Sequence, residues 1–206
     1  MEQWPRRRLW LPSPGMLVLL GVVVVLLAAI GIPGLSRAQR ASNERHASAM
    51  LKTLASAEAD FRTNDRDGNR VKDYWTGDVS GLYYVKNPAT KSEIKLIEAD
   101  VADADAKPLF PISRRDDSGY FFLAMDGDDS APENDLSYKV DTDQSGRKMH
   151  HESRFGFSTH PKDAGACRLS FFVNESNTVF REKRDKPRTD YPRRPGTEER
   201  VDVPGR

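Results

Sequence analysis

A short acidic turn is the first place in this sequence where residue types and spacing indicate chemistry. Asp65 and Asp67 stand at alternate positions before Gly68, and Asp73 follows a few residues later. Alternate carboxylates on a tight turn supply the oxygen ligands that Ca²⁺ prefers. The turn is not an EF-hand, because its twelfth loop position is Tyr74 rather than glutamate. We predict a calcium loop of another type formed by Asp65, Asp67 and Asp73, with a metal-free polar turn as the alternative.

The histidines and the single cysteine are the other residues with chemical potential. His150, His151 and His160 fall within eleven residues. Adjacent histidines on a strand point to opposite faces, so we expect exposed loop residues rather than a transition-metal site. Cys167 opens an apolar run without a neighbouring base, which predicts a buried structural thiol. Since the familiar nucleophile, zinc, phosphate-loop and dinucleotide motifs are also absent from the sequence, we predict no enzyme and no cofactor beyond calcium.

Charge is distributed unevenly along the 206 residues. The whole chain carries 32 basic and 31 acidic side chains, a balance that gives no drive toward nucleic acid. Residues 1–14 form a basic stub, residues 36–180 hold 20 basic and 24 acidic residues, and residues 181–206 are basic and rich in proline. We predict that this last segment is a disordered tail.

An uncharged segment covers residues 15–35. As a helix it would extend ~31 Å, which matches a hydrocarbon core of about 30 Å. We therefore predict a single transmembrane helix in a bacterial inner membrane, with the basic stub cytoplasmic and the following domain periplasmic or extracellular. The alternative is a secretory signal cleaved after Ala38. The side chains expected to contact the lipid bilayer include Leu17, Val22, Val25, Leu27 and Ile30.

The chain after this segment predicts a long amphipathic helix over residues 35–62. It contains no internal proline or glycine after Leu35 and is rich in alanine. Its apolar stripe is expected at Ala47, Met50, Leu54, Ala57 and Phe61, and its polar faces at Arg45, Lys52, Glu58 and Arg62. Turn formers over residues 63–69 should end it.

Residues 16–62 resemble the N-terminal helix of type IV pilins and type II secretion pseudopilins. The resemblance is carried by the apolar span and the following AAIGIPGLSRAQRASNERHASAMLKTLASAEADFR, in which Pro33 precedes an alanine-rich half. It implies a helix that is half buried in membrane, packs on a small antiparallel sheet and associates with other pilin-like subunits. The usual prepilin cleavage motif is missing, since Met16 follows Gly15 and Leu20 stands where the family has glutamate.

Residues 36–180 predict a pilin-like α+β domain, in which the long helix packs on an antiparallel sheet of roughly four strands. A short amphipathic helix is expected at 91–104, and strands at 119–125, 137–140, 154–158, 167–173 and 178–181, the last two forming a hairpin.

Two functional hypotheses follow from these patterns. The first is a non-enzymatic, single-pass membrane protein that serves as a structural or assembly component of a type II secretion or type IV pilus-like system. The alternative is a membrane-anchored, exported binding module for calcium or a small ligand that does not assemble.

Overall fold

The computed structural model describes residues 14–113, 119–129, 137–142, 146–163, 167–183, 187–192 and 199–200. Side chains are described for these ranges except at residues 24, 25, 27–34, 129, 199 and 200. The predicted basic stub therefore lies outside the described residues apart from Pro14. The chain divides into two compact units, Met1–Gln39 and Arg40–Arg206.

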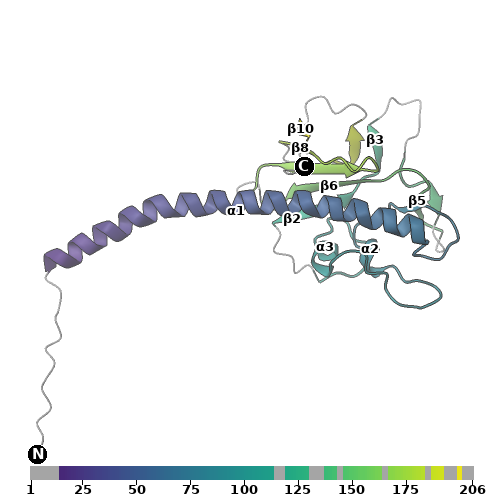
Figure 1. Ribbon diagram of the computed structural model, residues 1–206, viewed down its shortest axis with the longest axis horizontal. Helices are drawn as coiled ribbons and strands as arrows, with labels where there is room; N and C mark the ends of the chain where they lie inside the picture. The colour runs from purple at the N-terminus through teal and green to yellow at the C-terminus, as the bar shows by residue number, and fades with distance from the viewer. Residues whose placement is uncertain are drawn as a thin grey trace, which may run out of the picture. The chain divides into compact units, whose positions relative to one another are not determined.

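Helix α1 comprises Pro14–Asn64 and passes through both units (Figure 1). Proline at the first helical position is well accommodated, because the amide it lacks would have no partner within the helix. The helix ends where the chain turns to the left-handed conformation, with φ of 46° at Asp65 and 67° at Gly68. The turn formers after the helix thus predict its C-terminal end correctly.

The predicted transmembrane helix is wrong. Among the residues that the structure describes, no helix is both long and apolar enough to cross a bilayer. Without a membrane-spanning helix, the predicted single-pass inner-membrane location and periplasmic placement lose their support. The assignment to pili and type II secretion loses it as well, and the pilin-like fold is unconfirmed.

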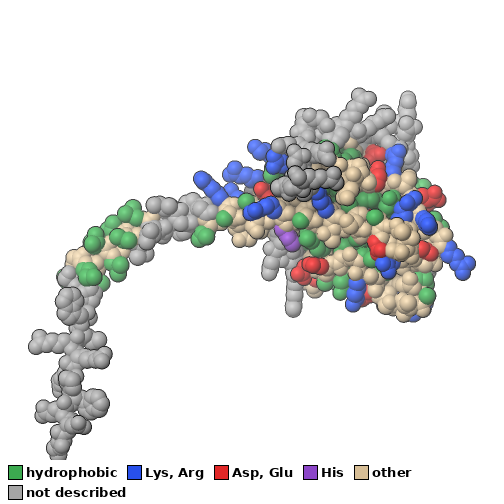
Figure 2. Space-filling view, viewed as in Figure 1, with side chains coloured by type: hydrophobic (Ala, Val, Ile, Leu, Met, Phe, Trp, Pro, Cys, Tyr) green, Lys and Arg blue, Asp and Glu red, His purple; other side chains and the backbone are tan. Residues whose placement is uncertain are grey.

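The side chains expected to contact lipid are only partly described. Leu17 is 54% exposed and Val22 is 52% exposed within the first unit. The side chains of Val25, Leu27 and Ile30 lie outside the described residues. Figure 2 shows the described part of this stretch as a run of hydrophobic side chains.

The second unit has the predicted α+β character. Its main sheet is five-stranded and antiparallel, in the order β10-β8-β7-β6-β2, one strand more than expected. The strands are β2 (Tyr120–Ala124), β6 (Gly156–Pro161), β7 (Ser170–Asn174), β8 (Phe180–Glu182) and β10 (Glu199–Arg200). The predicted hairpin is confirmed as β7 and β8, whose turn is closed by the amide of Asn177 donating to the carbonyl of Asn174.

Two smaller sheets complete the unit. Antiparallel β1, β5 and β4 form one of them, and parallel β3 and β9 form the other. The bounds are Tyr74–Trp75 for β1, Gly127–Asp129 for β3, Asp141–Thr142 for β4, Lys148–His151 for β5 and Asp190–Pro192 for β9. Short helices α2 (Gly81–Tyr84) and α3 (Ala99–Asp103) lie between β1 and β2 in the chain.

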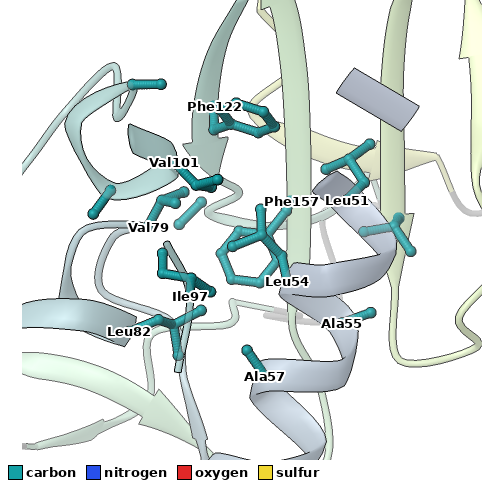
Figure 3. Packing of buried hydrophobic residues seen from close by; sticks show 14 of the residues in the cluster. Leu51, Leu54, Ala55, Ala57, Val79, Leu82, Ile97, Val101, Phe122 and Phe157 are labelled. Atoms are coloured by element: carbon teal, nitrogen blue, oxygen red, sulfur yellow. The ribbon is translucent and has the colours of Figure 1, made fainter. Parts of the chain in front are cut away.

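The core lies between the second half of α1 and the main sheet (Figure 3). Leu51 and Leu54 of α1 are fully buried and join the cluster that contains Phe122 of β2 and Phe157 of β6. Neighbouring residues of a strand point to opposite faces. The residue after Phe171 in β7 therefore belongs to a second cluster on the other face, made of Met125, Tyr138, Phe172 and Tyr191.

Two local predictions are wrong. Only Ala99–Asp103 of the expected 91–104 helix is helical. Positive φ at Lys91 and Lys95 interrupts the chain, and the amides of residues 94–96 donate to carbonyls of residues 82, 83 and 85. The expected disordered tail, residues 181–206, contains the end of β8 together with β9 and β10, and its Tyr191 is 7% exposed. The aromatic ring of Tyr191 packs edge-on against Phe172, which gives this proline-rich segment an apolar anchor.

Candidate functional site

The three predicted calcium ligands follow the end of α1, and their carboxylates have different partners. Asp65 uses both carboxylate oxygens to accept the backbone N–H of Arg70, at 3.2 and 3.1 Å, as a turn-forming aspartate does. Asp67 and Asp73 instead approach His150, from the two sides of its ring. A carboxyl group in this turn is therefore structural at Asp65 and available for other chemistry at Asp67.

His150 occupies the centre of the site because of strand pairing. Trp75 of β1 and His150 of β5 are directly opposite each other in an antiparallel pair, which brings their side chains together on one face. Their ring centroids are 5.2 Å apart at an interplanar angle of 86°, and Phe61 at the end of α1 lies 6.2 Å from the histidine ring. His150 is 1% exposed. The expectation of an exposed loop histidine is wrong at this position, whereas the half-buried His151 faces the other way, as the alternation predicts.

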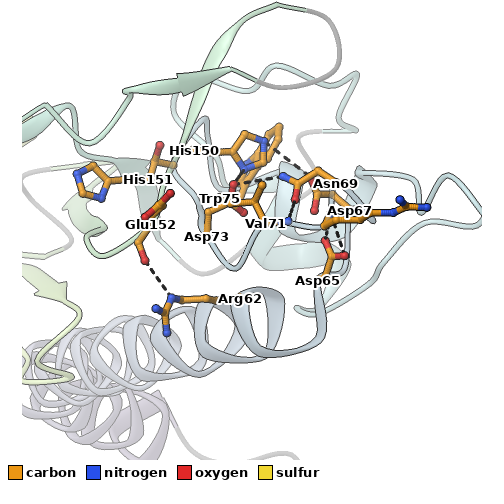
Figure 4. A network of polar contacts seen from close by, with 12 residues as sticks. Arg62, Asp65, Asp67, Asn69, Val71, Asp73, Trp75, His150, His151 and Glu152 are labelled. Atoms are coloured by element: carbon orange, nitrogen blue, oxygen red, sulfur yellow. Dashed lines mark hydrogen bonds and ion pairs between the residues drawn. The ribbon is translucent and has the colours of Figure 1, made fainter.

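Two carboxylates face the two ring nitrogens of His150 (Figure 4). Asp73 Oδ2 lies 3.4 Å from Nδ1, and Asp67 Oδ2 lies 3.9 Å from Nε2. The side-chain amide of Asn69 donates a hydrogen bond of 3.2 Å to the same Asp73 oxygen. The imidazole is thus held between two acidic groups in a space closed by Phe61 and Trp75.

Glu58 of α1 is a third buried acidic side chain and interacts electrostatically with Asp73, although its charge predicts a place on a polar face of the helix. It is 0% exposed, because it follows Leu54 by one turn and precedes Phe61 on the buried stripe. Its Oε2 accepts the backbone N–H of Trp75 at 3.0 Å. Burial raises the pKa of Glu58 well above its usual value, and the charge of Asp73 adds to the rise, so the protonated form is favoured. Glu58, Asp67, Asp73 and His150 are called the acid–histidine cluster below.

Two other buried carboxylates show what a purely structural role looks like. Asp78 accepts hydrogen bonds from the indole of Trp75 and from the backbone amides of Gly81 and Leu109. Asp105 accepts the amides of Val79, Ser80 and Lys107, each at 2.8 Å. Every carboxylate oxygen of Asp78 and Asp105 has a donor, so the two side chains link the loops around α2 and α3 by hydrogen bonds.

The acid–histidine cluster is different, because several of its oxygens have no donor. Within the part of the chain that the structure describes, Glu58 Oε1, Asp67 Oδ1 and Asp73 Oδ1 are buried and accept no hydrogen bond. Asp67 is 9% exposed. Burial raises the pKa of Asp67 to about 6, and the charges of Asp73 and Asp65 add to the rise. The attraction of His150 and a hydrogen bond from the backbone amide of Asn69 oppose it. Leaving such groups unsatisfied is unfavourable, and native proteins do so mainly where function requires it.

Asp67 and His150 also line a cavity of about 380 Å³, which is called the aromatic pocket below. This volume is within the range of roughly 300–1,000 Å³ that is typical of small-ligand sites. The Phe110 ring lies 6.3 Å from Trp75 and 6.3 Å from Tyr84, so three aromatic rings form a continuous wall. The remaining lining residues are Val85, which is buried, and Lys86 and Arg147, which are exposed.

The predicted calcium loop receives no support from this geometry. Across the described ranges, no group of three or more His, Cys, Asp or Glu residues is arranged to hold a metal ion. Cys167 is buried as predicted, in the segment before β7. His160 of β6 is half-buried and lies against Phe121, away from His150.

Comparison with protein-family models, curated proteins and solved structures finds no match to this chain. The function of the chain is therefore inferred from the arrangement of its own residues. Two features support the inference, namely the buried Oδ1 of Asp67, which accepts no hydrogen bond within the described residues, and the aromatic pocket that Asp67 lines.

Proposed function

We propose that this chain is a non-enzymatic binding module whose aromatic pocket holds a small organic ligand. The observation that carries the proposal is Asp67, which lines the cavity while its buried Oδ1 accepts no hydrogen bond within the described residues. Asp78 and Asp105 show that this chain provides donors to a carboxylate whose role is structural. A ligand that donates a hydrogen bond to Asp67 would satisfy the remaining oxygen.

The wall of the pocket supports the same proposal. Trp75, Tyr84 and Phe110 come from three separate segments, and the first two are held by hydrogen bonds to residues outside the cavity lining. The indole N–H of Trp75 donates to Asp78, and the Tyr84 hydroxyl donates to Asp103 at 3.3 Å. Aromatic rings fixed in this way offer a flat apolar surface at little cost in side-chain entropy.

Saturation-transfer difference NMR of the full chain tests the proposal. The probes are 2-phenylethylamine, 2-phenylethanol and 3-phenylpropionate, which share one aromatic body and differ in charge. We expect at least one of them to bind, and binding to be lost in Val85→Trp, because an indole at this lining position fills the cavity. Val71→Trp is the matched control, since Val71 is 42% exposed and outside the pocket.

Two outcomes of this experiment would contradict the proposal. Absence of saturation transfer to all of the probes with the wild-type chain would exclude an aromatic ligand site. Equal transfer in Val85→Trp and Val71→Trp would place the binding elsewhere. If circular dichroism shows that Val85→Trp is unfolded, Lys86→Trp replaces it, because Lys86 is an exposed residue at the edge of the same cavity.

A second proposal concerns the first unit, where large apolar side chains are exposed on all sides of the helix. The described ones are between 43% and 67% exposed over residues 16–23 and 26. A helix that is apolar all round is stable only when other surfaces cover it. We propose that copies of this chain associate through this stretch, as the expected lateral packing of the N-terminal helix implies.

Sedimentation velocity of the full chain tests this association. The wild-type chain should form oligomers that the double variant Leu17→Glu, Leu20→Glu dissociates, since buried carboxylates between helices are unfavourable. Arg37→Glu, at an exposed position without apolar character, is the matched control. A wild-type chain that remains monomeric at all concentrations studied would exclude this proposal.

A further inference from the structure

We infer that the aromatic pocket selects a cationic ligand, namely an aromatic amine whose ammonium group donates a hydrogen bond to Asp67 Oδ1 while its ring lies against Trp75 and Phe110. The inference rests on the proposed function and specifies the chemical class of the ligand for the same site.

The inner end of the pocket is acidic. Asp67 lines the cavity directly, and Asp73 lies against the other nitrogen of the His150 ring. His150 is already in contact with Asp67 and with Asp73. An additional anion placed here would meet like charges in a region shielded from water, whereas an ammonium group would gain an attractive, charge-assisted hydrogen bond.

The aromatic wall also favours a cation. The faces of Trp and Tyr rings attract positive charge, and such contacts are stronger where water is excluded. Trp75 is 3% exposed, so its ring contributes within a nearly dry environment. The cavity of about 380 Å³ has room for a ring in addition to the ammonium group.

Two basic residues that line the aromatic pocket would instead favour an anionic ligand. Lys86 and Arg147 line the pocket but are exposed. Attraction by exposed cations is weakened by water and salt, and the acidic group in contact with the ligand is the buried one. On the face shown in Figure 2, acidic and basic side chains are both present over the second unit.

The test is isothermal titration calorimetry of the full chain with 2-phenylethylamine, 2-phenylethanol and 3-phenylpropionate. We expect the amine to bind at least about tenfold more tightly than the alcohol, which has the same body without the charge. Asp67→Asn should abolish this preference. Asp65→Asn should retain it, because Asp65 is in the same turn but is bonded to Arg70 and does not line the pocket.

The outcomes separate the ligand class from the existence of the site. If the alcohol or the propionate binds the wild-type chain as tightly as the amine, the inference is overturned while the binding function stands. If Asp67→Asn keeps the preference for the amine, Asp67 is not the group that selects it and the inference is likewise overturned. If none of the probes binds the wild-type chain, both the inference and the proposed function fall.

Discussion

Replacing Asp67 by asparagine should stabilise the protein at neutral pH and leave its stability unchanged in acid. The carboxyl group of Asp67 is buried beside Asp73, and its pKa is raised from 3.8 to about 6. The native chain therefore binds this proton more tightly than the unfolded chain does. As a result, the free energy of unfolding is highest below pH 3.8 and decreases as the pH rises to about 6.

The size of the effect follows from the displacement of the pKa. At roughly 1.4 kcal/mol for each pKa unit, the wild-type chain loses at most about 3 kcal/mol of stability across this interval. The pKa of about 6 already includes the attraction to His150, which lowers it. Asparagine has nearly the same shape and does not ionise, so the variant avoids this loss. Glu58 titrates in both proteins, and its contribution therefore cancels when the two are compared.

Urea denaturation of the full chain, followed by far-UV circular dichroism at pH 4 and at pH 7.5, measures this difference. We expect the midpoints of Asp67→Asn and wild type to agree at pH 4 and the variant to be more stable at pH 7.5. The reasoning is refuted if the variant is equally or less stable at pH 7.5, since Asp67 would then be satisfied in its ionised form.

Asp105→Asn is the matched control for this measurement. Burial and the charge of Asp78 raise the pKa of Asp105 to about 6 as well. Its two oxygens, however, accept backbone amides from Val79, Ser80 and Lys107. Either orientation of an asparagine amide would place its NH₂ group against an N–H donor. Asp105→Asn should therefore be less stable than wild type by about 1–3 kcal/mol at pH 4, where Asp67→Asn is expected to match wild type. Because Asp105 also loses stability on ionising, this deficit should narrow at pH 7.5.

Substitutions at three further places test the packing around the site by urea denaturation. Glu58→Gln should change the free energy of unfolding by less than about 1 kcal/mol, because it keeps the acceptor for the Trp75 amide. Glu58→Ala should lower it by more than about 2 kcal/mol, and a strongly stabilised glutamine variant would show that Glu58 is ionised. Gly81→Ala should cost about 1–3 kcal/mol and alter indole fluorescence, because the added Cβ would lie 2.2 Å from Trp75 Nε1; unchanged stability would contradict this close approach. Phe122→Ala should cost about 3–5 kcal/mol, and Phe121→Ala, on the less buried face of β2, clearly less; equal losses would contradict the assignment of faces.

Four strands of the main sheet, β2, β6, β7 and β8, were predictable, because local patterns determine them. Turn formers after Phe61 ended α1 where expected, and the asparagine and serine turn between two β-rich runs produced the β7–β8 hairpin. The segment at 91–104 was misread because Ile94, Ile97 and Val101 have helical spacing. Ile97 and Val101 are indeed buried, but the backbone around Lys91 and Lys95 reaches the core in a non-helical form.

The site was only partly predictable. Asp67 and Asp73 were singled out as calcium ligands, and the structure brings both to a histidine instead. Glu58 was assigned to a polar face because it is charged, although its spacing from Leu54 and Phe61 places it on the apolar stripe. Such a conflict between residue type and helical position is a signal that sequence reasoning can use, since a carboxyl group is rarely buried without a reason.

The difference between a structural aspartate and one with an unpaired oxygen could not be predicted from the sequence. Asp67, Asp78 and Asp105 are all buried acidic residues next to turns, and nothing in their local sequence separates them. What separates them is the supply of donors, and these come from distant segments, as when Asp105 receives amides from residues 79 and 80. A carboxylate with a donor for each oxygen stabilises the fold, whereas one with a buried oxygen left without a donor at the wall of a cavity destabilises the ligand-free protein. The gain on binding is therefore largest at Asp67, because a ligand there removes a penalty that the folded chain otherwise retains.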